Sequence, residues 1–329
     1  MSKVKLPVDV VIAVTYKCNS RCTMCNIWQI QEPDELGLEY FKRLPKSLRY
    51  INISGGEPFL YQDLVKSIKL IKKTCPKAQL VISTNGFATQ LIIGLMKEIL
   101  KIDPHIGVAI SIDGIGEMHD KIRGIPGGFE KSMATVRALQ ELDMTNLRLA
   151  FTASKDNVSH LSKVYDLANK LGIQFTLSLA QSSEFFFGGK EVEEKPSVEE
   201  LKKQFEYLIK NELKKFSPKN WVRAYFAQQL YNFAITGKEP LSSRAGKDFF
   251  FLDPSGDVYP SVVHNMVMGN IKKEKDFRKI WFSAKANEIR ELITKHAQGV
   301  WMICTARTAI KKYPWRLGWW IFNKKILGK

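Results

Sequence analysis

Apolar residues in the first 180 positions of the chain gather in six short segments that are typical of buried β-strands. Several of these segments are nearly continuous apolar runs, as expected for parallel strands that are covered on both faces. Helix-like segments lie between them, so six β/α units predict a parallel barrel or an open parallel sheet. The predicted strands are residues 8–15, 50–54, 79–84, 106–113, 147–153 and 174–179, and the predicted helices are residues 36–44, 63–75, 90–102, 129–142 and 160–171.

The pattern changes near residue 185, where a polar stretch separates the first half of the chain from the second. Ser197-Val-Glu-Glu200 has the form of a capping box and predicts a helix that ends near residue 215. Further helices are predicted over residues 221–235, 276–282 and 284–296, and a hairpin over 248–262 with its turn at 253–257. We therefore divide the chain into a barrel (1–185), a helical connector (186–240), a small α+β extension (241–304) and a tail (305–329).

Composition is that of a globular protein, with 45% hydrophobic and 25% charged residues among 329. The sequence contains neither an apolar stretch long enough to span a membrane nor a signal peptide, which predicts a cytoplasmic protein. The formal charge of +17 indicates an anionic partner: nucleic acid, a phosphorylated substrate or an acidic membrane surface.

Cys18, Cys22 and Cys25 follow the first predicted strand with C-x3-C-x2-C spacing. Three thiolates hold a four-iron cluster and leave one iron open to a small molecule. A three-cysteine zinc site and chance clustering are the alternatives that the spacing leaves open. Three of the five cysteines lie within eight residues, which favours metal ligation in a reducing compartment over a disulfide framework.

Over roughly residues 8–180 the sequence resembles the radical S-adenosylmethionine (SAM) superfamily. The cysteine motif and four further motifs at strand ends carry the resemblance, in the order typical of the family. The further motifs are Ser54-Gly-Gly-Glu-Pro58, Ser83-Thr-Asn-Gly86, Ser111-Ile-Asp113, and Thr152 with Ser154. The resemblance implies a partial (β/α)6 TIM-like barrel, one [4Fe-4S] cluster on Cys18, Cys22 and Cys25, SAM, and a reducing partner such as a flavodoxin or ferredoxin.

The resemblance also implies which residues contact SAM. It assigns the methionine moiety of SAM to the backbone of Gly55 and Gly56, with Glu57 as acceptor for the ammonium group, although a simple tight turn is the alternative. Ser111 and Asp113 suit the ribose hydroxyls, unless this strand end only caps a following helix. The remaining predicted contacts are Asn85 and Thr152, which could instead satisfy local backbone groups, and Met24, which occupies the place of a usual aromatic residue and would cover the adenine.

Two further residues near these motifs admit alternative roles. Arg123 is predicted either to meet a carboxylate or phosphate or to lie on the surface at a helix entry. His119 is either structural or catalytic, and no catalytic residue follows from the sequence.

Residues 243–305 resemble the C-terminal extension of the SPASM/twitch group, which holds an auxiliary iron–sulfur cluster through cysteines. This chain has Ser243, Ser261 and Val300 in the flanking positions and retains only Cys304. One thiolate cannot hold a four-iron cluster, so we predict a cluster-free, twitch-like extension that is held together by packing. Cys75 lies outside every motif and is interpreted as a bystander thiol.

The tail 305–329 mixes cationic and aromatic residues and contains no acidic residue. This mixture suits peripheral contact with a membrane interface. Single-stranded nucleic acid on an aromatic platform, and a C-terminal helix packed on the barrel, are the alternatives.

The combined prediction is an enzyme that cleaves SAM reductively and abstracts a hydrogen atom from an unidentified, anionic or lipid-linked substrate. A peptide-modifying maturase and a catalytically silent cluster-binding scaffold are the alternatives. Zinc-dependent nucleic-acid binding is favoured only by charge, and nucleic acid is not the expected partner.

Overall fold

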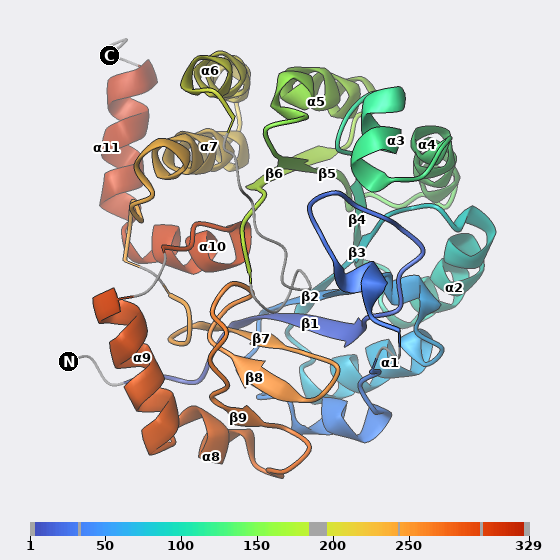
Figure 1. The fold of residues 1–329 in the computed structure, drawn as a ribbon, viewed down its shortest axis with the longest axis vertical. Coiled ribbons are helices and arrows are strands. Elements are labelled where there is room, and N and C mark those ends of the chain that lie inside the picture. Colours follow the sequence, from blue (N-terminus) through green and yellow to red (C-terminus); the bar gives the residue numbers. More distant parts are fainter. Residues whose placement is uncertain (1–3, 32–33, 184–195, 243, 297–298, 326–329) are drawn as a thin grey trace.

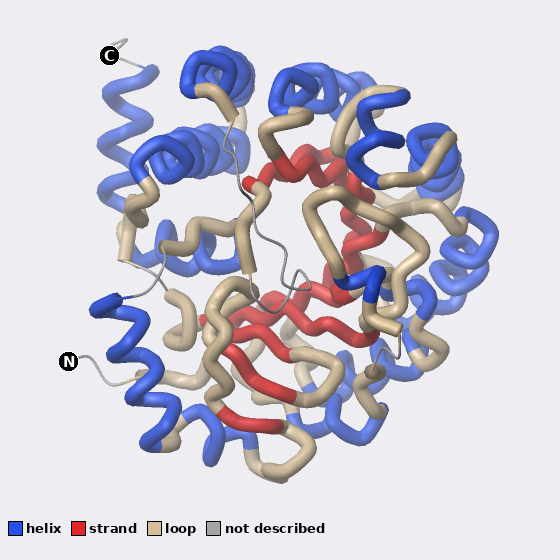
Figure 2. The backbone as a smooth tube through the Cα atoms, in the orientation of Figure 1, coloured by secondary structure: helices blue, strands red, loops and turns tan. Residues whose placement is uncertain are grey.

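The computed structural model describes residues 4–31, 34–183, 196–242, 244–296 and 299–325 (Figure 1). Its centre is a curved parallel sheet with helices on the outer side, as Figure 2 shows. The six strands of this sheet pair in chain order, each parallel to the next. This arrangement confirms the predicted α/β partial barrel. The strands are β1 (Asp9–Thr15), β2 (Tyr50–Gly55), β3 (Gln79–Thr84), β4 (Gly107–Ser111), β5 (Leu147–Ala153) and β6 (Gln174–Leu179).

The helices between these strands follow the predicted pattern closely, with two differences. Residues Leu38–Arg43 form a 3-10 helix rather than an α-helix. A seven-residue helix, α3 (Glu117–Arg123), was not predicted, because two turns are too short to show a periodic apolar face. The other helices of this part are α1 (Leu64–Thr74), α2 (Thr89–Ile102), α4 (Gly128–Gln140) and α5 (Leu161–Lys170).

The connector is a pair of packed helices, α6 (Val198–Lys214) and α7 (Pro218–Thr236). The Ser197 hydroxyl accepts a hydrogen bond from the Glu200 amide at 3.2 Å, which confirms the predicted cap. Helix α7 begins three residues earlier than predicted, with Pro218 in its first turn, where a missing N–H costs nothing.

The C-terminal extension continues the sheet of the barrel. Strand β7 (Phe249–Leu252) pairs parallel with β1, and β8 (Asp257–Tyr259) and β9 (Gly269–Asn270) follow antiparallel. The predicted hairpin is therefore present as β7 and β8, and together with β9 it extends the sheet of the described residues to nine strands. Helices α8 (Phe277–Trp281) and α9 (Ala284–His296) complete the extension.

Two helices form the last described part of the chain. Helix α10 (Ile303–Lys312) packs against β1 and buries Thr305, Ala306, Ala309 and Ile310. The predicted boundary between residues 304 and 305 falls inside this helix. Helix α11 (Pro314–Lys325) packs against α7, at the outer edge of the molecule in Figure 1. None of the described helices is both long and apolar enough to cross a membrane.

Candidate active site

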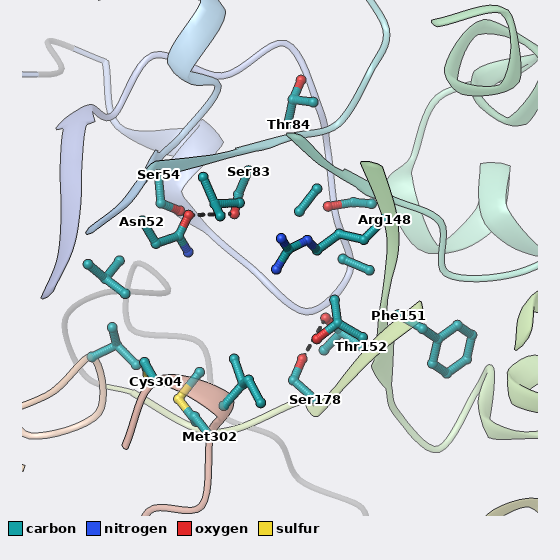
Figure 3. Close-up of a pocket in the computed structure, with 18 of the residues that line it drawn as sticks. Asn52, Ser54, Ser83, Thr84, Arg148, Phe151, Thr152, Ser178, Met302 and Cys304 are labelled. Carbon is teal, nitrogen blue, oxygen red and sulfur yellow. Dashed lines mark hydrogen bonds between the residues drawn. The ribbon is translucent and has the colours of Figure 1, made fainter. Parts of the chain in front are cut away.

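The barrel contains a cavity of about 870 Å³ that is partly open to solvent. At one end it is lined by the cysteine loop and by the carboxyl ends of the strands, where ligands bind in folds of this kind. At the other end it reaches the first residues of several strands. Figure 3 shows polar side chains of β2, β3, β5 and β6 that point into this space, together with side chains from the start of α10.

Cys18, Cys22 and Cys25 lie in the loop after β1 and all three line the cavity. The loop docks on the end of α3, because the Arg21 amide donates to the Arg123 carbonyl at 2.9 Å and the Thr23 amide to the Ile122 carbonyl at 2.9 Å. Gly124 permits this approach: it has φ +63°, and a Cβ there would lie 2.4 Å from the Arg21 carbonyl oxygen. The indole N–H of Trp28 donates to the Cys25 carbonyl at 2.7 Å and holds the far side of the loop.

The chemistry of the three thiols fits an iron–sulfur cluster. Burial raises the pKa of Cys18 to about 11 and that of Cys25 to about 12, so as free groups they stay protonated, and bound iron would convert them to thiolates. Within the described part of the chain, no three Cys, His, Asp or Glu side chains converge on one ion position. In a cluster each thiolate binds its own iron, so such convergence is not required.

Gly55 and Gly56 stand where β2 meets the cysteine loop, and both line the cavity. A Cβ on Gly55 would lie 2.2 Å from the Thr15 carbonyl oxygen, and one on Gly56 would lie 2.2 Å from that of Lys17. The amide of Gly56 donates to Thr15 at 2.8 Å, and that of Glu57 to Lys17 at 2.7 Å. The glycines are therefore required for the close approach of β2 to the loop that carries the cysteines.

Glu57 is buried and does not line the cavity. One carboxylate oxygen accepts from the Phe59 amide and from the Thr84 hydroxyl, at 3.2 and 2.8 Å, and the other accepts from the Asn85 amide at 2.8 Å. Burial raises the pKa of Glu57 to about 7, and these donors partly offset the shift. In this structure the carboxylate joins the ends of β2 and β3, and its hydrogen bonds are made within the protein.

Asp113 also lies outside the cavity lining and forms a buried ion pair. Its carboxylate is 2.5 Å from the Arg123 guanidinium and accepts a hydrogen bond from the Thr152 amide at 2.7 Å. The side chain of Arg123 is only 13% exposed, so the surface alternative was wrong and the carboxylate alternative is confirmed. Neither the sequence pattern nor the motif order identified Asp113 as its partner.

Arg123 also donates toward the Cys22 sulfur at 3.6 Å. His119, in the same helix, packs edge-on against Phe87 and Phe129. Burial lowers the pKa of His119 to about 3, and the Arg123 charge adds to the shift. His119 is therefore neutral, and its Nδ1 accepts from the Asp113 amide at 3.2 Å, which places it in the support of this strand end.

The other predicted contact residues, Met24, Asn85, Ser111 and Thr152, all line the cavity. The Asn85 side chain donates to the Asn19 side chain at 2.7 Å and so ties β3 to the cysteine loop. The Thr152 and Ser178 hydroxyls are 3.1 Å apart, as the dashed line in Figure 3 marks. Ser178 was missed by the sequence analysis, although it follows the same pattern of a polar residue near a strand end.

The positions that the sequence analysis compared with auxiliary-cluster ligands have mixed surroundings in the structure. Val300 and Cys304 are buried in a cluster with Phe249, Phe251 and Val262. The Ser261 hydroxyl lies 2.7 Å from Nδ1 of His264. Ser243 lies outside the described residues. The described side chains do not present the thiolate set that an auxiliary cluster requires.

Comparison with protein families agrees with this geometry. The profile of the radical SAM superfamily matches residues 12–168. A second profile, SPASM, an iron–sulfur cluster-binding domain, matches residues 244–306.

Curated relatives match parts of the chain. The Fe-coproporphyrin III synthase of Methanosarcina barkeri is 34% identical over 176 residues, which cover 50% of this chain and 42% of that protein. The AdoMet-dependent heme synthase of the same organism is 28% identical over 251 residues, or 71% of this chain and 68% of that protein. The sporulation killing factor maturation protein SkfB of Bacillus subtilis is 28% identical over 195 residues, or 55% of this chain and 45% of that protein.

Solved structures share the fold at low identity. SuiB of Streptococcus suis bound to S-adenosylmethionine has a TM-score of 0.66 at 15% identity, over 89% of this chain and 69% of that chain. Native anSMEcpe with bound AdoMet has a TM-score of 0.62 at 15% identity, over 97% of this chain and 100% of that chain.

Proposed function

We propose that this chain cleaves SAM reductively and removes a hydrogen atom from a substrate that binds in the barrel cavity. The proposal starts from the membership of the chain in the radical SAM superfamily and from its SPASM-type extension. A single observation carries the proposal. The three cysteines of one loop and the polar groups of several strand ends line the same cavity. When bound, a reduced [4Fe-4S] cluster supplies the electron that breaks a carbon–sulfur bond of SAM.

In this proposal, some residues of the cavity bind the cluster and others contact SAM. Cys18, Cys22 and Cys25 would hold the cluster. Met24 and the backbone of Gly55 and Gly56 would border the SAM molecule near the cysteine loop. The side chains that offer polar groups to the rest of SAM are Asn85, Ser111 and Thr152.

Glu57 and Asp113 act on this site through the backbone. Glu57 accepts from the Asn85 amide, and Asp113 accepts from the Thr152 amide, so each buried carboxylate orients a residue that does line the cavity. Both are therefore positioning residues in this proposal, which does not require either carboxylate to contact SAM directly.

We further propose that the chain holds one cluster. The extension matched by the SPASM profile contains one cysteine, Cys304, among residues 244–306. Val300 and Cys304 pack among aromatic and aliphatic side chains, which supports an extension stabilised by apolar contacts. Reduction would then come directly from an external donor such as a flavodoxin or ferredoxin.

The substrate class follows only from chemistry and from relatives. Two relatives are named for heme or coproporphyrin synthesis and one for the maturation of a sporulation killing factor. The charge of +17 favours an anionic substrate, which tetrapyrrole carboxylates and phosphorylated carriers both satisfy. Peptide modification is the second candidate, on the similarity to SkfB.

We also propose that α11 contacts an anionic lipid surface. Trp315, Trp319 and Phe322 lie on one face of this helix and are exposed, with Trp315 at 62% and Trp319 at 65%. The tail 305–329 contains no acidic residue, so its charge complements anionic headgroups.

The activity is tested with the full chain after anaerobic cluster reconstitution, reduction with dithionite and addition of SAM. We expect 5′-deoxyadenosine from the wild-type protein and none from Cys22→Ala. Cys75→Ala is the matched control, because Cys75 is buried in the core away from the cavity, and it should remain active. An intact cluster without 5′-deoxyadenosine would favour the silent scaffold, and zinc in place of iron would discard the proposal.

A further inference from the structure

The cavity extends through the barrel to the end opposite the cysteine loop. Its lining includes the first residues of four strands, Asp9 of β1, Tyr50 of β2, Gln79 of β3 and Gln174 of β6. Each residue of a strand adds about 3.3 Å to its length, so these first residues lie far from the carboxyl ends of the same strands. The proposed SAM site therefore accounts only for the part of the cavity next to the cysteine loop, which we call its upper end.

Positively charged side chains lie at the lower end of the cavity, which is the end opposite the cysteine loop. Arg148 of β5, Lys219 of α7 and Arg307 of α10 line it from three different elements. Asp9 is the carboxylate of this lining, and it pairs with Arg307 at 3.2 Å. The lining thus carries more cationic than anionic groups.

Arg148 lacks a counter-ion among the described residues. Its side chain points into the cavity in Figure 3. One terminal nitrogen donates to the Asn146 side-chain oxygen at 2.6 Å, while its Nε is buried without a hydrogen-bond partner. A buried donor on a charged group costs free energy when it stays unpaired, so this position favours a ligand that accepts hydrogen bonds.

The surrounding charges strengthen this preference. Burial lowers the pKa of Arg148 to about 10, and the neighbouring Arg307 and Arg223 guanidinium groups add to the shift. Arg223 itself donates to the Gln174 side chain at 2.7 Å and so remains held nearby. Arg148 still carries its charge at neutral pH, and an anion beside it would relieve both the burial and the repulsion.

We propose that Arg148 binds an anionic group of the substrate, a carboxylate or a phosphate, at the lower end of the cavity. The planar guanidinium offers paired donors that match either group. Arg148 is four residues before Thr152 on β5, so the anionic group would lie about 13 Å from the level of the SAM contacts. This inference rests on the proposed function, since it assigns the substrate of that same cavity: an elongated molecule with an anionic end remote from the reacting C–H bond.

The test measures equilibrium binding without turnover, on the reconstituted full chain in about 0.15 M salt, where long-range surface attraction is screened. The probes are inorganic pyrophosphate, glutarate and the neutral analogue glutaramide. We expect at least one anion to bind, glutaramide not to bind, and Arg148→Gln to weaken anion binding about tenfold or more, the effect of losing a charge-assisted hydrogen bond. The anion that binds more tightly identifies the group as phosphate or carboxylate.

Arg137→Gln is the matched control, because it removes the same charge from a side chain that is 57% exposed on α4. It should leave anion binding within about twofold, as expected of a screened surface charge. Arg148→Lys keeps the charge without the planar fork and should bind the anion with intermediate affinity. Equal weakening by Arg148→Gln and Arg137→Gln, or no binding of either anion, would overturn the inference. Because no turnover is involved, failure of SAM cleavage would refute the proposed function and leave this result standing.

Discussion

The guanidinium of Arg123 lies 3.6 Å from the Cys22 sulfur, although the two residues are 101 positions apart in the sequence. The same guanidinium pairs with Asp113 at 2.5 Å. A buried cation therefore links the loop that carries the cysteines to the end of β4. Because a cluster with thiolate ligands is anionic, a fixed positive charge at this distance would stabilise its bound state.

Removing Arg123 should destabilise the fold as well as the cluster. Arg123→Met leaves the Asp113 carboxylate buried and unpaired, which costs about 3–5 kcal/mol. The double variant with Asp113→Asn should lose less than the sum of the two single variants, because the pair is removed together. Urea unfolding of the cluster-free chain measures the free energy of unfolding of the two single variants and the double variant, and Arg137→Met on the surface is the control. If the loss in the double variant equals the sum of the two single losses, the two side chains do not interact as a buried pair.

Iron content should equal one cluster. We expect about four irons per chain after anaerobic reconstitution. Cys18→Ala, Cys22→Ala or Cys25→Ala should remove them, whereas Cys304→Ala should retain them, since Cys304 is buried in an apolar cluster of the extension. Iron and sulfide analysis decides this, and about eight irons in the wild-type chain would show a second cluster.

Gly56→Ala should disturb the seat of the cysteine loop. The added Cβ would lie 2.2 Å from the Lys17 carbonyl oxygen and 2.7 Å from that of Tyr16, both of them backbone atoms. Overpacking of this kind costs about 1–3 kcal/mol, and we expect cluster loading to fall with it.

Gly94→Ala is the control for this change. Gly94 lies within α2, and a Cβ there meets nothing within 4 Å. Alanine should stabilise the helix by about 1 kcal/mol. If Gly56→Ala unfolds at the same urea concentration as the wild-type chain, the close approach at Gly56 is not a constraint in solution.

The aromatic face of α11 should decide membrane binding. Trp315→Ser with Trp319→Ser removes two exposed indoles and should greatly reduce pelleting with vesicles that contain phosphatidylserine. Trp320→Phe is the control, because Trp320 lies on the other side of the helix and packs against Tyr225 with ring centroids 5.4 Å apart. Equal co-sedimentation of the wild-type chain and the double variant would refute the lipid contact.

The sequence by itself determined the barrel and the location of its chemistry. The predicted bounds of β3, β5 and β6 agree with the structure to the residue, because apolar residues at alternate positions mark the buried face of each strand. The cysteine spacing and the polar residues at strand ends located one end of the cavity, because parallel strands bring their carboxyl ends to the same side. The sequence also showed directly that Ser243, Ser261 and Val300 stand in the extension where the resemblance implies cysteines.

Only the tertiary structure decided which distant groups meet. The partners of Glu57, Asp113 and Arg123 come from other strands and helices, and no local pattern encodes such contacts. The same holds for Arg148, which an alternating strand position alone would not distinguish from a surface arginine. Its significance depends on a cavity closed by α7 and α10, two helices that follow in the sequence only after the barrel is complete.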